Sequence, residues 1–96
     1  MKYTILPTSP YQKSYKRLKE SGKFKKEAQK RLDTAIDIVA SGQVLPREYQ
    51  DHQLVGELRE YRECHIKVDL LLVYQIRKSE LLLILVDIGT HSYLGM

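Results

Sequence analysis

The chain has 96 residues, of which 43% are hydrophobic and 29% charged, and its formal net charge is +4. A chain of this length forms one domain with a single thin core, which excludes a separate substrate-binding domain. The longest apolar run, Leu81 to Val86, is far shorter than the roughly 18–20 residues of a membrane span, so we expect no membrane insertion.

Two features of the sequence indicate a cytoplasmic location. Residues 1–7 carry one charged side chain and are of mixed polarity, unlike the apolar stretch of a signal peptide. Cys64 is the single cysteine, so an internal disulfide is impossible, which fits a reducing compartment. We therefore expect a cytoplasmic protein.

The first 22 residues contain two predicted elements. Alternating apolar residues predict a short strand over Lys2–Leu6. Ser9, followed three residues later by Gln12, resembles a helix-capping pair and predicts a helix that ends at Gly22.

A second helix is predicted by apolar residues that recur at helical spacing from Phe24 to Val39, with Gly42 as its stop. Together the two helices predict a hairpin with its apolar side on a sheet and its lysines in water. Between Lys13 and Arg31 there are nine basic residues and two acidic ones. Such a segment can bind phosphates, but it is equally typical of a solvated helix face.

The second half of the chain predicts a loop and then strands. The loop covers residues 43–56, and the strands cover residues 57–65, 70–76 and 81–88, with a hairpin turn at 78–79 of uncertain type. The expected fold is mixed α and β (α+β), in which two helices cover one face of a sheet that includes a three-stranded antiparallel meander. The other face of the sheet is also apolar, so we expect it to be covered by the C-terminal residues or by a second protein.

Three histidines and an aspartate lie near predicted strand ends. His52 is on the loop, His65 and Asp69 flank a strand connection, and His91 follows the last strand. Antiparallel strands could bring all four to one edge. Cleavage of RNA without a metal needs a base for the 2′-hydroxyl, positive charge for the phosphorane-like transition state and an acid for the leaving 5′-oxygen. Imidazole, with a pKa near neutrality, suits both proton transfers.

Other interpretations of these residues are open. A lone histidine is more often a surface or core residue than a catalyst, and the set could instead bind zinc. The sequence contains neither a pair of histidines at helical spacing nor a pair of cysteines, so we expect no metal and no cofactor. Cys64 and His65 are neighbours in a strand and should point to opposite faces, which argues against a nucleophilic pair. Tyr93 could stack on a base, although packing is its simpler role.

Three segments resemble the signature blocks of the YafQ branch of the RelE toxins: Asp51–Gly56, Tyr61–Tyr74 and Gly89–Ser92. The resemblance implies one small RelE-like domain over residues 1–96. It also implies a toxin of a type II toxin-antitoxin system, an endoribonuclease that cuts mRNA in the ribosomal A site and is neutralised by a cognate antitoxin.

The resemblance assigns catalysis to His52, His65, Asp69 and His91. It implies that His91 is the general acid and that His65 or Asp69 is the base, with His52 near the phosphate. RNA contacts are expected from Arg62, Lys67, Tyr93, Lys13, Lys16, Lys23 and Lys26. The expected partners are mRNA on the ribosome, ribosomal RNA, an acidic antitoxin, and operator DNA only through that antitoxin.

The chain departs from the family pattern at four positions. Val68 and Leu70 stand where Pro and Trp are common, Asp87 stands where an Arg is frequent, and Gly95 stands where a Phe is usual. Loss of a cation and two aromatic rings is expected to weaken RNA binding or transition-state stabilisation.

Two alternative functions follow from these observations. The first is a poison of DNA gyrase of the ParE type, which shares the fold but needs no acid and base, so the three matched histidines argue against it. The second is a weakened toxin that acts mainly in antitoxin-bound regulation, which the four departures favour.

Overall fold

The structure is a computed structural model that describes residues 2–95. Its helices and strands, in chain order, are β1 (Thr4–Pro7), α1 (Ser9–Glu20), α2 (Lys26–Ala40), β2 (His52–Gln53), β3 (Arg62–Lys67), β4 (Leu70–Arg77), β5 (Leu82–Gly89) and α3 (His91–Leu94). Short 3₁₀ turns cover Arg47–Tyr49, Gly56–Leu58 and Lys78–Glu80.

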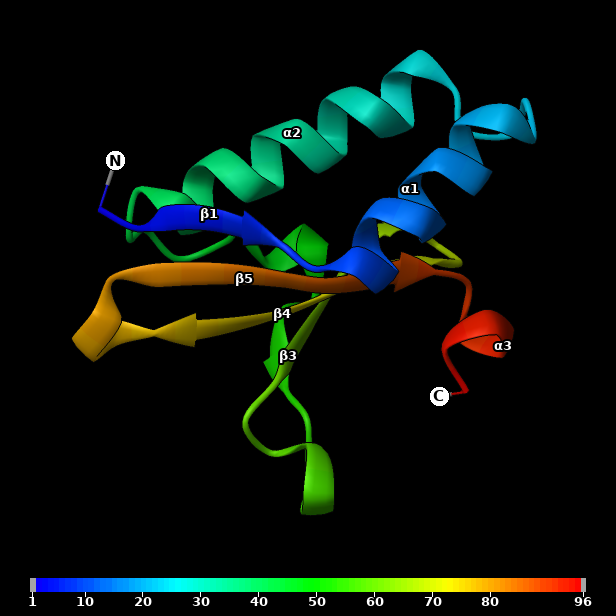
Figure 1. The fold of residues 1–96 in the computed structure, drawn as a ribbon. Helices are drawn as coiled ribbons and strands as arrows, with labels where there is room; N and C mark the ends of the chain where they lie inside the picture. Colours follow the sequence, from blue (N-terminus) through cyan, green and yellow to red (C-terminus); the bar gives the residue numbers. More distant parts are fainter. Residues whose placement is uncertain (1, 96) are drawn as a thin grey trace.

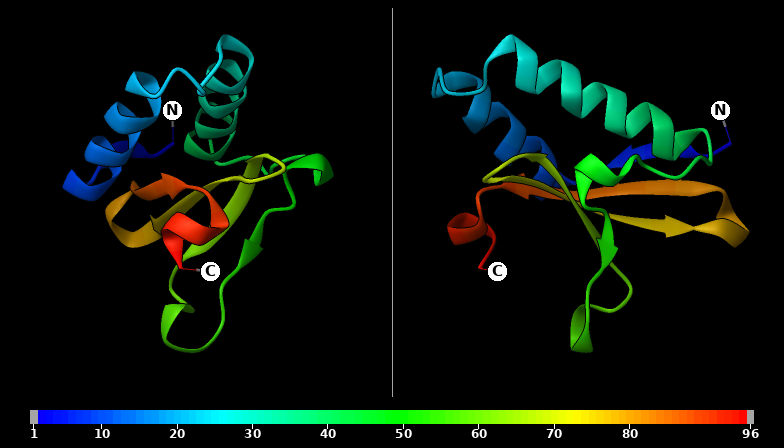
Figure 2. Two further views of the ribbon diagram at one scale, coloured as in Figure 1. Left: turned by 90° about the vertical axis from the view of Figure 1, so that its right-hand side faces the viewer. Right: turned by 180° about the vertical axis from the view of Figure 1, so that it is seen from behind.

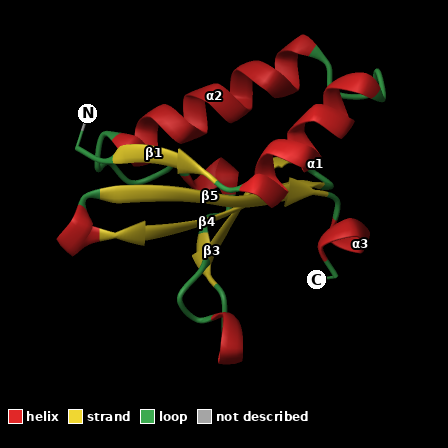
Figure 3. Cartoon of the chain, viewed as in Figure 1, coloured by secondary structure: helices red, strands yellow, loops and turns green. Residues whose placement is uncertain are grey.

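The five strands form one sheet in the order β1-β5-β4-β3-β2. β1 runs parallel to β5, and every other neighbouring pair is antiparallel. Both long helices lie on one side of this sheet, whereas α3 and the loop between β2 and β3 extend on the other side (Figures 1 and 2). This arrangement confirms the predicted α+β class with helices on one face of an antiparallel meander (Figure 3).

The helix starts differ slightly from the predictions. Thr8, not Ser9, caps α1: its hydroxyl oxygen accepts from the Tyr11 amide at 3.1 Å and donates to the Val86 carbonyl at 2.8 Å. The second bond ties the helix start to β5, a long-range contact that no local pattern contains. α2 begins at Lys26, so Phe24 precedes the helix, where it packs edge-on against Tyr15 with ring centroids 5.6 Å apart.

The strand predictions are wrong at two places. The predicted strand over residues 57–65 starts only at Arg62, since Gly56–Leu58 forms a 3₁₀ turn. Within the predicted loop, His52 and Gln53 form the short strand β2, where they pair with Glu63 and Arg62. Two residues are too few for an alternation pattern to reveal a strand.

The main core lies between the helices and the sheet. Leu32, Ile66, Tyr74 and Leu83 are almost completely buried there, as is Cys64. The opposite orientation of Cys64 and His65 is therefore confirmed, because Cys64 belongs to this core and His65 lies near His91 on the other face.

The second face of β4 is also covered. Leu71 and Val73 are buried although they do not belong to the core beneath the helices. At this strand the chain's own residues provide the cover that the apolar pattern required. Among residues 2–95, none of the helices has the length and apolar character needed to traverse a bilayer.

Burial of Cys64 generates the first prediction. Removal from water, reinforced by the negative charges of Asp51 and Glu63, raises the pKa of the Cys64 thiol to about 12. Because only the thiolate is nucleophilic, alkylation by iodoacetamide at pH 8 should be at least about 100-fold slower in the folded protein than in urea. Mass spectrometry of the time course measures both rates. Similar rates in the two states would contradict the buried position.

Candidate functional site

The antiparallel register brings the histidine-bearing segments together. In β4, Leu71 pairs with His65 of β3 on one side and with Gly89 of β5 on the other. In β2, His52 pairs with Glu63 of β3. His65 and the end of β5 thus lie two strands apart in the same row of the sheet.

A tight turn after β5 folds His91 back over this row. The Thr90 side chain accepts from the Tyr93 amide at 3.0 Å and so caps α3, whose first residue is His91. Gly89 permits the turn, because a Cβ atom there would lie 2.5 Å from the Tyr93 ring. A larger residue at this position would force the Tyr93 ring to shift.

Asp69, in the turn between β3 and β4, holds His91 in place. Its Oδ1 accepts from the His91 backbone N–H at 3.0 Å and from the His91 Nδ1 at 2.6 Å. These two hydrogen bonds, the backbone one first, lower the pKa of Asp69. Since a carboxylate can only accept, the proton of the neutral imidazole sits on Nδ1, and Nε2 is the position that gains or loses a proton.

His65 faces the same space from β3. Its ring lies edge-on to the His91 ring, at a centroid distance of 5.7 Å and an interplanar angle of 65°. The structure therefore brings His65, Asp69 and His91 together, as the sequence predicted for a single edge of the sheet.

His52 contacts Glu63, a residue of the site that the sequence analysis did not predict. The Glu63 carboxylate is buried, and its Oε1 lies 3.4 Å from Nε2 of the exposed His52. The other imidazole nitrogen of His52 is 2.9 Å from the Gln50 carbonyl oxygen. Among the described residues, Glu63 Oε2 has no hydrogen-bond partner. The available signal was its position two residues before His65 in a strand, which puts both side chains on one face.

Three of these residues could hold a metal ion. Glu63, His65 and His91 each offer one ligand atom, and these atoms lie within 4.8 Å of one another. Carboxylate and imidazole ligands suit zinc and other transition metals. A search for ligands at helical spacing could not reveal this group, because two of its members lie in β3 and the third follows β5.

Two basic residues predicted to contact RNA form ion pairs within the chain. Arg62 Nη2 lies 2.7 Å from the Asp51 carboxylate, which also accepts from the Tyr74 hydroxyl. Lys67 Nζ lies 2.9 Å from Glu27 at the start of α2.

Tyr93 has a structural contact on each side. Its hydroxyl is 2.9 Å from the Ser14 hydroxyl, and the Arg17 guanidinium lies 5.2 Å from its ring centroid. The ring is nevertheless half exposed. Base stacking by Tyr93 stays a prediction.

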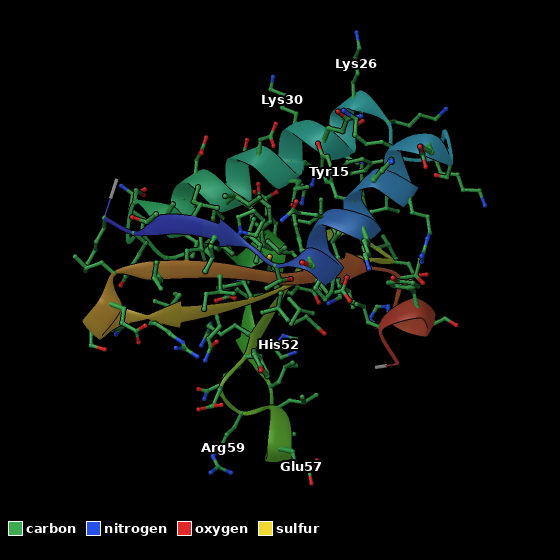
Figure 4. All side chains as sticks on the ribbon, viewed as in Figure 1. Tyr15, Lys26, Lys30, His52, Glu57 and Arg59 are labelled. Carbon is green, nitrogen blue, oxygen red and sulfur yellow. The ribbon has the colours of Figure 1, made fainter. Side chains whose placement is uncertain are left out.

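The four predicted lysines are all exposed. Those expected to contact RNA are Lys13, Lys16, Lys23 and Lys26. In Figure 4, Lys26 and Lys30 extend from α2 away from the sheet, whereas His52 lies on the opposite side of the molecule. Lys26 is thus remote from His52.

The structure shows the contacts of two residues that depart from the family pattern. Leu70 is buried in the main core. Asp87 accepts from the Ser14 hydroxyl at 2.6 Å and from the Ile88 amide at 2.8 Å. The Asp87 carboxylate is therefore hydrogen-bonded to two neighbouring donors.

Comparison with known proteins gives a consistent result. Over residues 3–96 the sequence matches the model of a family described as "Bacterial toxin of type II toxin-antitoxin system, YafQ". A protein of Haemophilus influenzae named as a toxin YafQ is 55% identical over 42 residues, which are 44% of this chain and 41% of that protein. The mRNA interferase toxin YafQ of Escherichia coli is 38% identical over 50 residues, 52% of each chain. These matches span about half the length of the curated relatives.

Two solved structures resemble the whole fold. A metal-bound toxin from Helicobacter pylori has a TM-score of 0.85 and 43% identity, covering 96% of this chain and 98% of the other. The toxin fold also matches the E. coli DinJ-YafQ toxin-antitoxin complex, with a TM-score of 0.81, 26% identity and 98% coverage of both chains.

The contact between Asp69 and His91 generates the second prediction. In neutral His91 of the wild type, the proton should reside on Nδ1, and Asp69→Asn should shift the population towards the Nε2–H form. Long-range ¹⁵N–¹H spectra of the imidazole rings measure this, with the His65 ring as the internal control. An unchanged His91 tautomer in the variant would contradict the assignment.

The contact between Asp69 and His91 also determines how the stability of the folded protein changes with pH. Because the pKa of Asp69 is lowered in the folded protein, its contribution to stability is present above the unfolded pKa and is lost as pH falls through the lowered value. The difference in unfolding free energy between wild type and Asp69→Asn should therefore be largest near neutral pH and shrink on acidification.

Proposed function

The chain belongs to the YafQ family of toxins from bacterial type II toxin-antitoxin systems, and on that premise we propose that it is an endoribonuclease that cleaves mRNA on the ribosome. The observation that carries the proposal is the Asp69–His91 hydrogen bond with the His65 ring beside it. Two imidazoles so placed can remove one proton and supply another across a single phosphodiester.

The proposed reaction begins with His65 as the general base. It takes the proton of the 2′-hydroxyl, and the 2′-oxygen attacks the adjacent phosphorus. His91 Nε2 donates its proton to the leaving 5′-oxygen as the bond from phosphorus to that oxygen breaks. The products are a 2′,3′-cyclic phosphate and a free 5′-hydroxyl.

Asp69 serves as a positioning residue in this scheme. Its Oδ1 already accepts two hydrogen bonds from His91, so orientation of the imidazole suits it better than abstraction of the 2′-hydroxyl proton. Because Asp69 is occupied in orienting His91, we assign the role of the base to His65 and not to Asp69.

Glu63 and His52 complete the proposed site. We place His52 near the scissile phosphate, with the Glu63 carboxylate oxygen 3.4 Å from its Nε2 to hold the imidazole in position. The exposed position of His52 leaves it accessible to RNA.

Partners of the chain are part of the proposal. The DinJ-YafQ complex is an assembly of the E. coli toxin, and we infer a cognate antitoxin for this chain by family membership. The basic stretch of α1 and α2 is suited to an acidic antitoxin and to ribosomal RNA. Contact with operator DNA would occur only through the antitoxin, and the site of action would be the cytoplasm.

The third prediction tests the acid. Inducing the wild-type chain without antitoxin should arrest growth and cut translated mRNA, and His91→Gln should lower cleavage by about 10²- to 10⁴-fold and restore growth. Primer extension on a reporter mRNA measures cleavage. Glu57→Gln, at the exposed end of the loop between β2 and β3, is the matched control and should retain wild-type toxicity (Figure 4).

Soluble His91→Gln protein that cuts mRNA as fast as the wild type would refute the proposal. Growth arrest with intact mRNA and inhibited gyrase would favour a gyrase poison instead. Intact mRNA and normal growth with the wild-type chain would favour a toxin that has lost its activity.

A further inference from the structure

An apolar cleft opens beside the Asp69–His91 pair. Its volume is about 640 Å³, and it lies between the α1–α2 connection, the β3–β4 turn and the start of α3. Leu18, Ala28, Leu70 and Ile88 contribute apolar walls. Asp69 and Thr90, which orient and cap the segment carrying His91, also line it.

We propose that this cleft binds the base of a nucleotide adjacent to the scissile phosphate. The proposal rests on the proposed function and deepens it, because it assigns a substrate subsite to a surface next to the acid. A base in the cleft would position the ribose-phosphate backbone across His65 and His91.

One wall of the cleft is fixed before any ligand binds. Ser14 donates its single hydroxyl proton to Asp87 at 2.6 Å, so the Tyr93 hydroxyl is the donor to Ser14 at 2.9 Å. The Tyr93 ring packs closely over Gly89, where no Cβ interferes. A wall held in this way needs little ordering when a flat ligand enters.

The chemistry of the lining fits a nucleotide. Apolar walls suit the faces of a base, which enzymes acting on RNA or DNA commonly hold between apolar or aromatic side chains. Arg17, Lys23 and Lys25 stand among the lining residues and supply positive charge for the flanking phosphates. In contrast, Lys67 in the same lining is paired with Glu27.

The position of the cleft next to the proposed acid, His91, favours RNA over a protein as its occupant. An acidic peptide with apolar side chains could also complement the cleft, but it has no need to reach Asp69 and Thr90. A base adjacent to the cleaved phosphate must lie within one nucleotide of the acid. We therefore assign the cleft to RNA.

The experiment uses the intact toxin and a trinucleotide whose 2′-hydroxyls are methylated, so that it cannot be cut. Methyl resonances of Leu18, Ala28, Leu70 and Ile88 should shift on titration at millimolar concentration. Val68→Trp should raise the dissociation constant about fivefold or more by filling the lip of the cleft, the scale expected for loss of one base contact.

Val68 suits this substitution because its side chain is 91% exposed, so a larger ring does not disturb the core. The matched control is Val55→Trp, at an 85% exposed position that does not line the cleft. Its dissociation constant should stay within about twofold of the wild-type value, since no base contact is removed.

Absence of methyl shifts with the trinucleotide would overturn the proposal, and so would equal binding by Val68→Trp and the control. Shifts caused by an acidic apolar peptide but not by the trinucleotide would overturn it in favour of a protein occupant. These outcomes are separable from failure of the proposed function: mRNA cleavage that still depends on His91 would show that only the cleft assignment is wrong.

Discussion

The register of β4 against its two neighbours is the constraint on which the site depends. Leu71 pairs with His65 and with Gly89, so His65 in β3 and the end of β5 are separated by two strand spacings, roughly 10 Å. The turn capped by Thr90 then folds His91 back until the two imidazole centroids are 5.7 Å apart. A one-residue slip of β4 would send His65 and Leu71 to opposite faces.

Two carboxylates act on the imidazoles from different environments. Asp69 is exposed and accepts two hydrogen bonds from His91, which fixes where the imidazole proton resides. Glu63 is buried, with one oxygen near His52 and the other without a partner among the described residues. A buried carboxylate oxygen without a partner is unusual in a folded protein, and this one lies in the strand that carries His65. The two carboxylates therefore contribute to the site as much as the pairing of the strands does.

Much of this arrangement is predictable from sequence because the key residues lie at strand ends. Asp69 and His91 follow β3 and β5, which both run antiparallel to β4 between them, so the ends of β3 and β5 lie at the same edge of the sheet. Glu63 was missed because a buried glutamate in a strand looks like an ordinary solvent-facing residue until its partner strand is known. The ion pair of Arg62 with Asp51 was equally invisible, since the two residues are 11 positions apart and meet only through the fold of the segment between them. Long-range pairing, not local propensity, decides these contacts.

The central claim is that His91 donates the proton to the leaving 5′-oxygen. The most direct measurement compares cleavage by wild type and His91→Gln on ribosomes programmed with ordinary mRNA and with mRNA carrying a 5′-bridging sulfur at the cleaved bond. Sulfur leaves without a proton, so His91→Gln should be severely impaired on the oxygen substrate and nearly as fast as wild type on the sulfur substrate. An equal loss on both substrates would contradict the claim and assign His91 to another role.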